Sequence, residues 1–175
     1  MVSVEIMIVS METSSRRAAR AHRSSDPPAS ALEAHLGYWL RLVSNAVSRA
    51  FERALQKRNI SVAEWVAINQ LAAETGLTPA KLAATMGMTR GAISKVLDKL
   101  ASKKLISRSV SPLDSRVQFL SLTEQARRIL PELTNIADGN DGYFFSALNS
   151  NEKAALRNLL RKLAGAHQIT RIPVE

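Results

Sequence analysis

A single change of hydrophobic period constrains the fold of this chain most. Up to about residue 103, and again beyond residue 123, apolar side chains recur at steps of three and four, the period of amphipathic helices. Between these regions, residues 106–110 and 117–122 are short runs of β-branched and apolar residues, separated by the turn-forming sequence SPLDSR. We therefore expect a mainly α-helical protein with one small β-hairpin, an α+β fold in which the hairpin follows four helices.

Capping sequences predict where the helices begin. Ser30 with Glu33, and Ser61 with Glu64, have the S-x-x-E spacing of a capping box, in which each side chain satisfies an unpaired N–H of the first turn. These pairs predict a long helix over about 30–58 and a second helix that ends before Gly76. The further helices are predicted to begin at Thr78, Thr89, Thr123 and Asn149.

Residues 79–98 have the spacing that a helix-turn-helix requires. Ala83 is small enough for two helices to cross closely, Gly87 permits a left-handed turn, and Ile93 fills the space between the helices. At 100° per residue, the core face of the second helix contains Ile93, Val96, Leu97 and Leu100, and the outer face contains Gly91, Ser94, Lys95 and Asp98. An outer face that is small and polar near the helix N-terminus suits contact with base edges and phosphates. An ordinary pair of packed helices with a solvated basic face fits the same pattern.

The positive charge is concentrated around this pattern. The chain has 24 Lys and Arg against 15 Asp and Glu, a net charge of +9, which indicates a polyanionic partner. Residues 78–116 hold eight basic and two acidic side chains, whereas residues 1–30 hold four basic and three acidic ones. The excess therefore lies mainly on the predicted helix-turn-helix and hairpin.

The predicted hairpin has the features of a DNA-binding wing. Arg116 at its tip suits insertion into a narrow, electronegative minor groove. Asp114 is expected to hold that guanidinium in position through a charge-assisted hydrogen bond. The alternative for this pair is a surface salt bridge of little energetic value.

Residues 82–123, with the D-x-R sequence in the wing and the closing L-T, resemble the winged helix-turn-helix of the MarR family of bacterial transcriptional regulators. The resemblance extends over residues 31–165. It implies a winged module at about 61–123 and dimerisation helices at about 30–58 and 124–165, together one domain over 30–165. It also implies a homodimer that presents two modules to a pseudo-palindromic site on double-stranded DNA.

By motif position, the resemblance implies DNA contacts at Thr89, Arg90, Gly91, Ser94 and Lys95 in the recognition helix and at Asp114 and Arg116 in the wing. The chain departs from the family pattern at two positions. Ala126 stands where a Gly usually follows L-T, and Lys104 replaces the Gly of a K-G-L turn. Neither residue lies on the expected DNA face, so the departures concern local backbone geometry.

A small-molecule pocket between the helical region and the winged module is typical of the family. The candidate lining residues are His35, Trp39 and Trp65, and the expected ligand is a small aromatic or phenolic compound. The alternative is that both tryptophans are simply core residues.

Several other classes of function are excluded. The chain has no cysteine, so thiol catalysis, disulfides and thiolate metal sites are ruled out. His22, His35 and His167 are scattered, so we expect no metal. No phosphate-binding glycine loop or nucleophile elbow is present, and we expect neither an enzyme nor a cofactor. Residues 6–9 are too short an apolar run for a membrane span, which favours a cytoplasmic protein without a membrane partner.

Both ends of the chain are expected to lie outside the domain. Residues 1–29, rich in Ser, Ala, Arg and Pro, predict a disordered tail, and residues 166–175 a C-terminal tail. Two classes of function remain. We expect a sequence-specific transcriptional regulator, a ligand-responsive repressor. The alternative is a basic architectural or membrane-surface protein that binds without sequence preference.

Overall fold

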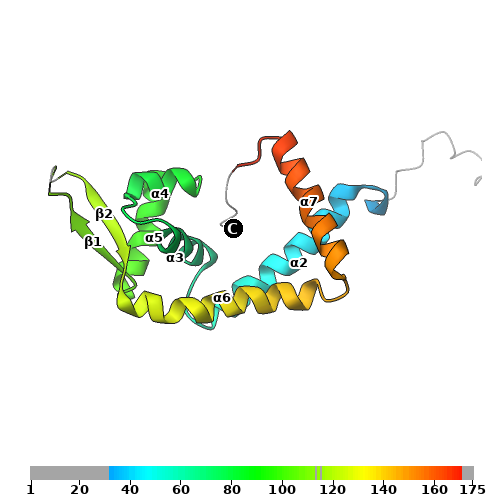
Figure 1. Cartoon of the computed structure of the whole chain (residues 1–175), viewed down its shortest axis with the longest axis horizontal. Coiled ribbons are helices and arrows are strands. Elements are labelled where there is room, and N and C mark those ends of the chain that lie inside the picture. Colours follow the sequence, from blue (N-terminus) through cyan, green and yellow to red (C-terminus); the bar gives the residue numbers. More distant parts are fainter. Residues whose placement is uncertain (1–31, 113, 115, 171–175) are drawn as a thin grey trace, which may run out of the picture. The chain divides into compact units, whose positions relative to one another are not determined.

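The computed structural model describes residues 32–112, 114 and 116–170 (Figure 1). The predicted tail over 1–29, the Ser30 half of the first capping box and residues 171–175 lie outside the described residues. The chain divides into two units, Met1–Leu42 and Val43–Glu175.

The elements follow the predicted order of helices, hairpin and helices. They are the 3-10 turn η1 (Leu32–Ala34) and helices α2 (Leu36–Gln56), α3 (Val62–Ala73), α4 (Pro79–Thr85) and α5 (Arg90–Ser102), then strands β1 (Ile106–Val110) and β2 (Gln118–Leu122), then helices α6 (Glu124–Phe144) and α7 (Ser150–Ala166). The mainly α-helical fold with one β-hairpin is therefore confirmed.

The first helix begins later than the sequence predicts. The sequence predicts a helix from about residue 30, but α2 starts at Leu36, after the separate turn η1. The N–H groups of His35 and Tyr38 donate to carbonyls three residues earlier, as in a 3-10 turn. The carbonyl of Glu33 accepts from the indole N–H of Trp39 at 2.8 Å, so a side chain occupies the acceptor that the next α-helical turn would use.

The core of the second unit lies between α3, α4, α5, the hairpin and the first half of α6. All four residues of the predicted inner face of α5 are buried, which confirms the helical phase: Ile93, Val96, Leu97 and Leu100. Leu55 at the end of α2 and Leu133 in α6 are also fully buried. Burial of these side chains fixes which face of α5 remains in solvent.

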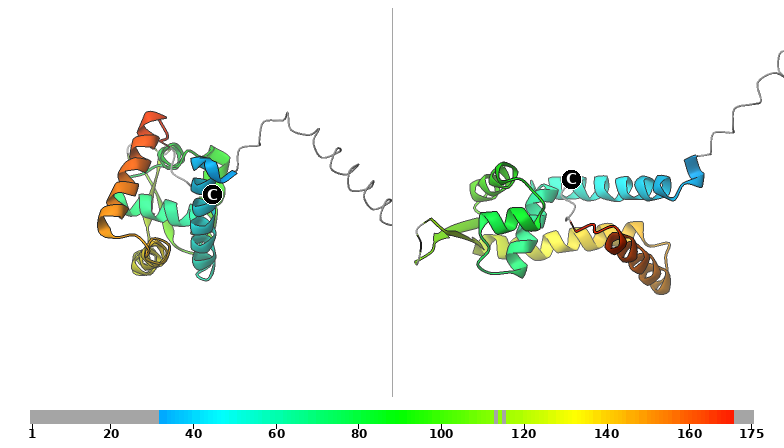
Figure 2. Two further views of the ribbon diagram at one scale, coloured as in Figure 1. Left: turned by 90° about the vertical axis from the view of Figure 1, so that its right-hand side faces the viewer. Right: turned by 90° about the horizontal axis from the view of Figure 1, so that it is seen from above.

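The hairpin is antiparallel and extends away from the helices of the module (Figure 2). Ile106 lies opposite Leu122 at its base, and Val110 opposite Gln118 near its tip. Leu77, just before α4, adds a bridge that the sequence did not predict, since the N–H of Leu120 donates to its carbonyl at 2.8 Å. This bridge ties the base of the hairpin to the start of α4.

Helix α6 is continuous where the sequence allowed an interruption. The sequence predicts a kink at Pro131, whose ring removes one helical hydrogen bond, and a break near Gly139 and Gly142. The predicted break is wrong, because the helix runs unbroken from Glu124 to Phe144, with Pro131 inside it. One contact that supports this part of α6 is the amide of Asn140, which donates to the carbonyl of Val47 in α2 at 3.3 Å. Tertiary contact outweighs low local propensity here.

The two departures from the family pattern have different structural consequences. Ala126 is fully buried in the first turn of α6, and its N–H donates to the Thr123 hydroxyl at 3.2 Å, so alanine fits an ordinary helical position. Lys104 has a φ of +58°, in the left-handed region that favours glycine. The turn between α5 and β1 therefore keeps the backbone of a glycine turn with a lysine in it.

We expect Lys104→Gly to stabilise the fold by about 1 kcal/mol, because it removes the steric cost of a side chain at positive φ. Urea unfolding monitored by circular dichroism measures the change. Lys104→Ala is the matched control, since it removes the charge and the long side chain but keeps the Cβ atom. An equal gain from both substitutions would show that the charge, rather than the backbone, causes the effect.

Candidate nucleic-acid interface

The turn between α4 and α5 has the geometry that the sequence predicts. Gly87 adopts a φ of +62°, and the N–H of Met88 donates to the carbonyl of Ala83 at 2.9 Å, which closes the turn. Thr89 then caps α5, its hydroxyl accepting from the N–H of Ala92 at 3.2 Å. The direction of α5 is thus set by one left-handed residue and one cap.

The five residues expected to contact DNA from α5 share an exposed position at the beginning of that helix: Thr89, Arg90, Gly91, Ser94 and Lys95. The first turn of α5 contains no acidic side chain. The backbone N–H groups of this turn carry the positive end of the helix dipole, and Arg90 and Lys95 add two cations. This end of α5 can therefore bind phosphate oxygens and reach base edges.

The wing places Asp114 and Arg116 at the exposed end of the hairpin. One oxygen of the Asp114 carboxylate accepts from the backbone N–H of Arg116 at 2.9 Å, a bond that the sequence does not predict. An Asp side chain readily binds a backbone N–H two residues later, and this local bond forms without ordering the long arginine side chain. Asp114 therefore shapes the turn that carries Arg116.

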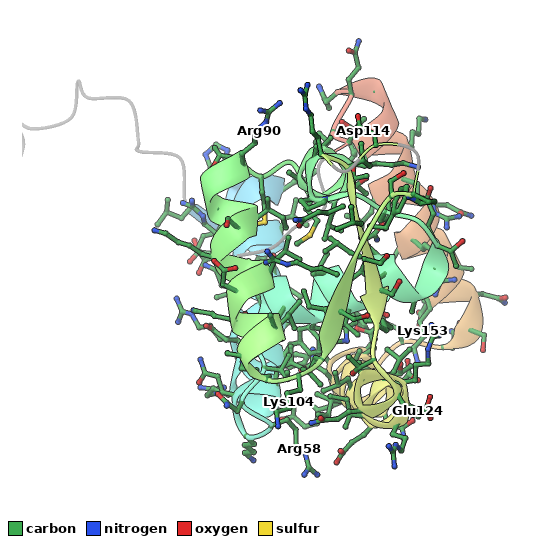
Figure 3. All side chains as sticks on the ribbon, turned by 90° about the vertical axis from the view of Figure 1, so that its left-hand side faces the viewer. Arg58, Arg90, Lys104, Asp114, Glu124 and Lys153 are labelled. Carbon is green, nitrogen blue, oxygen red and sulfur yellow. The ribbon has the colours of Figure 1, made fainter. Side chains whose placement is uncertain are left out.

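In Figure 3, Arg90 and Asp114 lie at one end of the view, and Lys104 and Glu124 lie at the other. The start of α5 and the wing are thus on the same side of the module in this view, away from the α5–β1 turn.

An ion pair that no sequence pattern predicts joins α5 to the hairpin. Arg108 of β1 donates to the Asp98 carboxylate at 2.9 Å. Asp98 is the acidic residue on the outer face of α5, so this bond neutralises the group there that would repel a phosphate. Neither the spacing of ten residues nor the residue types distinguish this pair from other charges on the chain.

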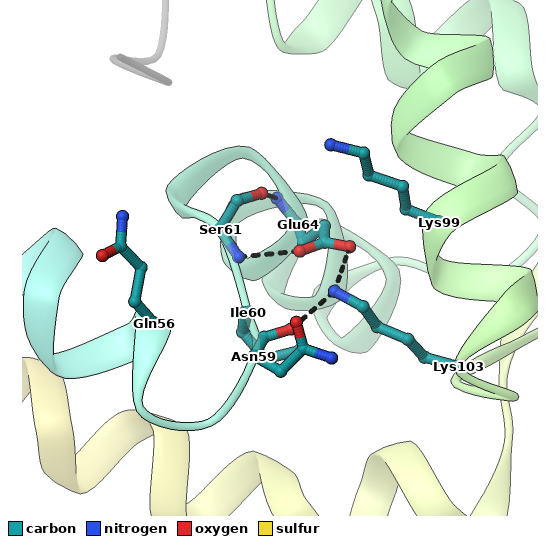
Figure 4. Close-up of a pocket in the computed structure, with 7 residues that line it drawn as sticks. All are labelled: Gln56, Asn59, Ile60, Ser61, Glu64, Lys99 and Lys103. Carbon is teal, nitrogen blue, oxygen red and sulfur yellow. Dashed lines mark hydrogen bonds and ion pairs between the residues drawn. The ribbon is translucent and has the colours of Figure 1, made fainter.

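Glu64 forms the capping box that its spacing predicts and also an ion pair that the spacing does not predict. Its side chain completes the predicted capping box, with the N–H of Ser61 donating to Oε2 at 2.7 Å. The residue is only 1% exposed, and its Oε1 accepts from Nζ of Lys103 at 2.6 Å (Figure 4). Nζ of Lys103 also donates to the backbone carbonyl of Asn59 at 2.5 Å. One lysine at the end of α5 therefore contacts both α3 and the turn that follows α2.

The environment of Glu64 shifts its pKa. Burial alone would raise this pKa, but the hydrogen bonds from Lys103 and Ser61 and the charge of Lys103 outweigh burial. The net pKa of Glu64 lies below its usual value of 4.5, and the carboxylate stays ionised at neutral pH.

The three candidate effector residues belong to both units. His35 and Trp39 are in the first, where Trp39 is 48% exposed and packs edge to face on Tyr38 with ring centres 5.3 Å apart. Trp65 is in the second, half-buried and edge to face with Phe51 at 4.9 Å. It lines a cavity of about 510 Å³ between α2 and the start of α3.

Among residues 32–112, 114 and 116–170, no cluster of three His, Asp or Glu side chains is suited to hold a metal ion. Within the same residues, every helix is too short or too polar to cross a membrane.

A sequence model of the MarR family matches residues 58–117. A protein of Thauera aromatica, named as a transcriptional regulatory protein for the hcr operon, is 30% identical to this chain over 129 residues, which cover 73% of this chain and 78% of that protein. The chain belongs to the MarR family. It is a DNA-binding transcriptional regulator of the MarR type and not an enzyme.

Solved structures of other proteins share its fold. CouR from Rhodococcus jostii RHA1, solved with p-coumaroyl-CoA bound, matches with a TM-score of 0.66 and 25% identity, over 78% of this chain and 96% of CouR. A mutant of MarR from E. coli, solved with operator DNA, matches with a TM-score of 0.65 and 24% identity, over 73% of this chain and 92% of that chain. The second comparison shows likeness of fold.

Proposed function

We propose that this MarR-type regulator is a sequence-specific repressor that binds a pseudo-palindromic site on double-stranded DNA as a homodimer, in the cytoplasm, and responds to a small ligand. The observation that carries the DNA part is the exposed start of α5, which presents Arg90, Ser94 and Lys95 near the N-terminal end of the helix. The wing adds Arg116 on a separate, projecting element.

The two elements would have different tasks. Ser94 and Lys95 lie on the outer face of a helix of the size that fits a major groove, where side chains distinguish base pairs. Arg116 lies near the end of a hairpin and would supply charge to the backbone or to the minor groove. The helix would therefore determine which sequence is preferred, and the wing would contribute affinity for any duplex.

The alternative is a basic architectural protein that binds DNA without sequence preference. The net charge of +9 supports either function. Competition between selected and random duplexes at fixed salt separates them, because only a protein that reads base edges shows a large specificity ratio.

The homodimer is supported by apolar side chains that the chain itself does not cover. No residue of α7 is buried, although the helix carries large apolar side chains. Of these, Leu159 is 60% exposed and Leu163 is 52% exposed. Leu36 and Leu40 on the first half of α2 are exposed as well. Apolar stripes of this length on two helices are typical of an interface between chains.

The cavity beside Trp65 supports an aromatic effector. Phe51 and Trp65 offer aromatic surface, and Arg49 offers a cation for a carboxylate or phenolate. Nε1 of Trp65 is buried and has no hydrogen-bond partner among the described residues. A polar ligand atom at this N–H would remove the cost of leaving a buried donor unpaired. His35 and Trp39 remain candidates in the first unit.

We expect substitutions in α5 and in the wing to differ in kind. Lys95→Ala should cost about 1–3 kcal/mol on a duplex selected by the chain from genomic fragments, and less on duplexes altered at the contacted base pair. Arg116→Ala should weaken binding to all duplexes and reduce the salt dependence by about one charge. Fluorescence anisotropy with selected and random duplexes measures both effects. Lys57→Ala, on the turn after α2, controls for loss of one charge. If Lys95→Ala weakened all duplexes equally, α5 would not be the reading element.

We expect the chain to sediment at about twice 19.1 kDa at low micromolar concentration. Leu163→Glu should shift it toward the monomer, because a buried unpaired carboxylate in an apolar interface is unfavourable. Val110→Glu, at an equally exposed apolar position of β1, is the matched control and should leave the dimer intact. A folded, stable wild-type monomer would contradict the proposed assembly.

We expect one or more small aromatic carboxylates or phenols to release the selected duplex. Trp65→Phe, which keeps an aromatic ring but removes the N–H, should weaken such a ligand by about 1–3 kcal/mol in isothermal titration calorimetry. Thermodynamic reciprocity requires that the duplex lower the affinity of the protein for the ligand by the same factor by which the ligand lowers its affinity for the duplex. Trp39→Phe tests the first unit in the same way. A ligand that releases DNA but is unaffected by either substitution binds elsewhere.

A further inference from the structure

We propose that Lys103 is a positioning residue for DNA binding: by joining the end of α5 to α3 and to the turn after α2, it holds the start of α5 in its DNA-binding orientation. The inference rests on the proposed function only in that α5 is taken as the element that reads DNA. Lys103 itself lies at the opposite end of α5 from Arg90, Ser94 and Lys95.

The side chain of Lys103 contacts two other segments of the chain at once. Lys103 is the C-cap residue of α5, and its Nζ donates to the Glu64 carboxylate at 2.6 Å and to the Asn59 carbonyl at 2.5 Å (Figure 4). The two acceptors lie 39 and 44 residues away along the chain. A single ammonium group thus connects α5 to two other segments of the second unit.

Both acceptors of Lys103 are held in place by hydrogen bonds that do not involve Lys103. The other oxygen of Glu64 accepts from the N–H of Ser61 at 2.7 Å, and the residue is buried, so the carboxylate cannot turn away into solvent. Asn59 has a φ of +55°, a conformation that asparagine tolerates well, and its N–H donates to the carbonyl of Gln56 at 2.9 Å. Lys103 therefore meets a fixed pair of acceptors, and its own side chain is 23% exposed.

This contact has an effect that the apolar core does not have. The inner face of α5 packs through Ile93, Val96, Leu97 and Leu100, and such contacts are largely non-directional. A hydrogen-bonded ion pair is directional, so it can fix the rotation and axial position of the helix. Because α5 is a continuous helix about 20 Å long, a small rotation at Lys103 displaces the DNA-facing turn at its other end.

Glu64→Gln gives the sharpest test, because two explanations predict opposite results. It keeps a side chain that can accept from the Ser61 N–H but removes the ion pair with Lys103, and it makes the chain more positive by one charge. If charge alone mattered, Glu64→Gln would bind DNA more tightly. If Lys103 positions α5, Glu64→Gln should bind the selected duplex about tenfold more weakly, with little change on random duplex.

Two controls match the charge changes. Glu124→Gln, at an exposed position at the start of α6, makes the same change of charge and should not weaken binding. Lys99→Met removes a cation one helical turn before Lys103, and Lys99 lines the same pocket as Glu64 and Lys103 (Figure 4). Among the described residues, Lys99 forms no ion pair that this substitution would remove. Lys103→Met should lower the ratio of selected to random affinity far more than Lys99→Met, and Lys103→Arg should restore most of it. Equal losses for Lys103→Met and Lys99→Met on both duplexes would overturn the proposal.

The double variant Glu64→Gln/Lys103→Met covers the case in which a single variant fails to fold. It leaves neither partner buried with an unpaired charge and has the net charge of the wild type. Its affinity for the selected duplex should fall about tenfold at equal salt. Unchanged affinity in this folded variant would overturn the proposal.

A measurement without DNA separates this inference from the proposed function. The chain has no cysteine, so nitroxide labels can be attached at Ser94→Cys and Glu124→Cys, with labelled chains diluted by unlabelled ones. The distribution of distances between the labels should broaden or shift in Lys103→Met and remain unchanged in Lys99→Met. An unchanged distribution in Lys103→Met would overturn the positioning role. A changed distribution in a protein whose wild type prefers no duplex would leave that role in place and refute sequence-specific binding.

Discussion

The turn at Gly87 is the constraint on which the rest of the winged module depends. Its φ of +62° lets α4 and α5 cross while Ala83 remains buried between them, and the crossing directs Ile93 into the core. A side chain with a Cβ atom at this position would be strained whatever space surrounded it. Once the crossing is fixed, the phase of α5 follows, and the small polar residues at its start necessarily face solvent.

Local signals made most of this fold predictable from sequence. The caps at Ser61, Thr78, Thr89 and Asn149 each depend on residues within three positions along the chain, and all four form as predicted. The predictions that were wrong concern elements whose bounds do not follow from local sequence alone. Helix α2 starts late because the Trp39 side chain takes a backbone acceptor, and α6 passes Gly139 without a break. In both cases a tertiary or side-chain contact outweighs local propensity, which no periodicity in the sequence reports.

In the candidate site too, features set by local sequence were predictable and contacts between distant residues were not. Exposure of the residues at the start of α5 follows from helical phase and was predictable, whereas the ion pairs Asp98–Arg108 and Glu64–Lys103 join residues far apart in sequence. For Glu64, the capping spacing predicts the bond of one carboxylate oxygen to the Ser61 N–H. It does not predict the bond of the other oxygen to Lys103. The remaining signal is an acidic residue in the first turn of a largely apolar helix, which by itself indicates only a cap.

The acidic residues of this region are arranged so that they do not oppose a polyanion. Asp98 is paired with Arg108, and Asp114 accepts from a backbone N–H, so each carboxylate is already engaged within the module. Exposed pairs of this kind add little to stability, so their value lies in the electrostatic potential that remains around the start of α5 and the wing. Glu64 is different, because it is buried and its charge is satisfied away from that surface. An acidic group in the interior can therefore connect α3 to the end of α5 without weakening the positive face at the helix start, and the two ends of α5 can serve separate purposes.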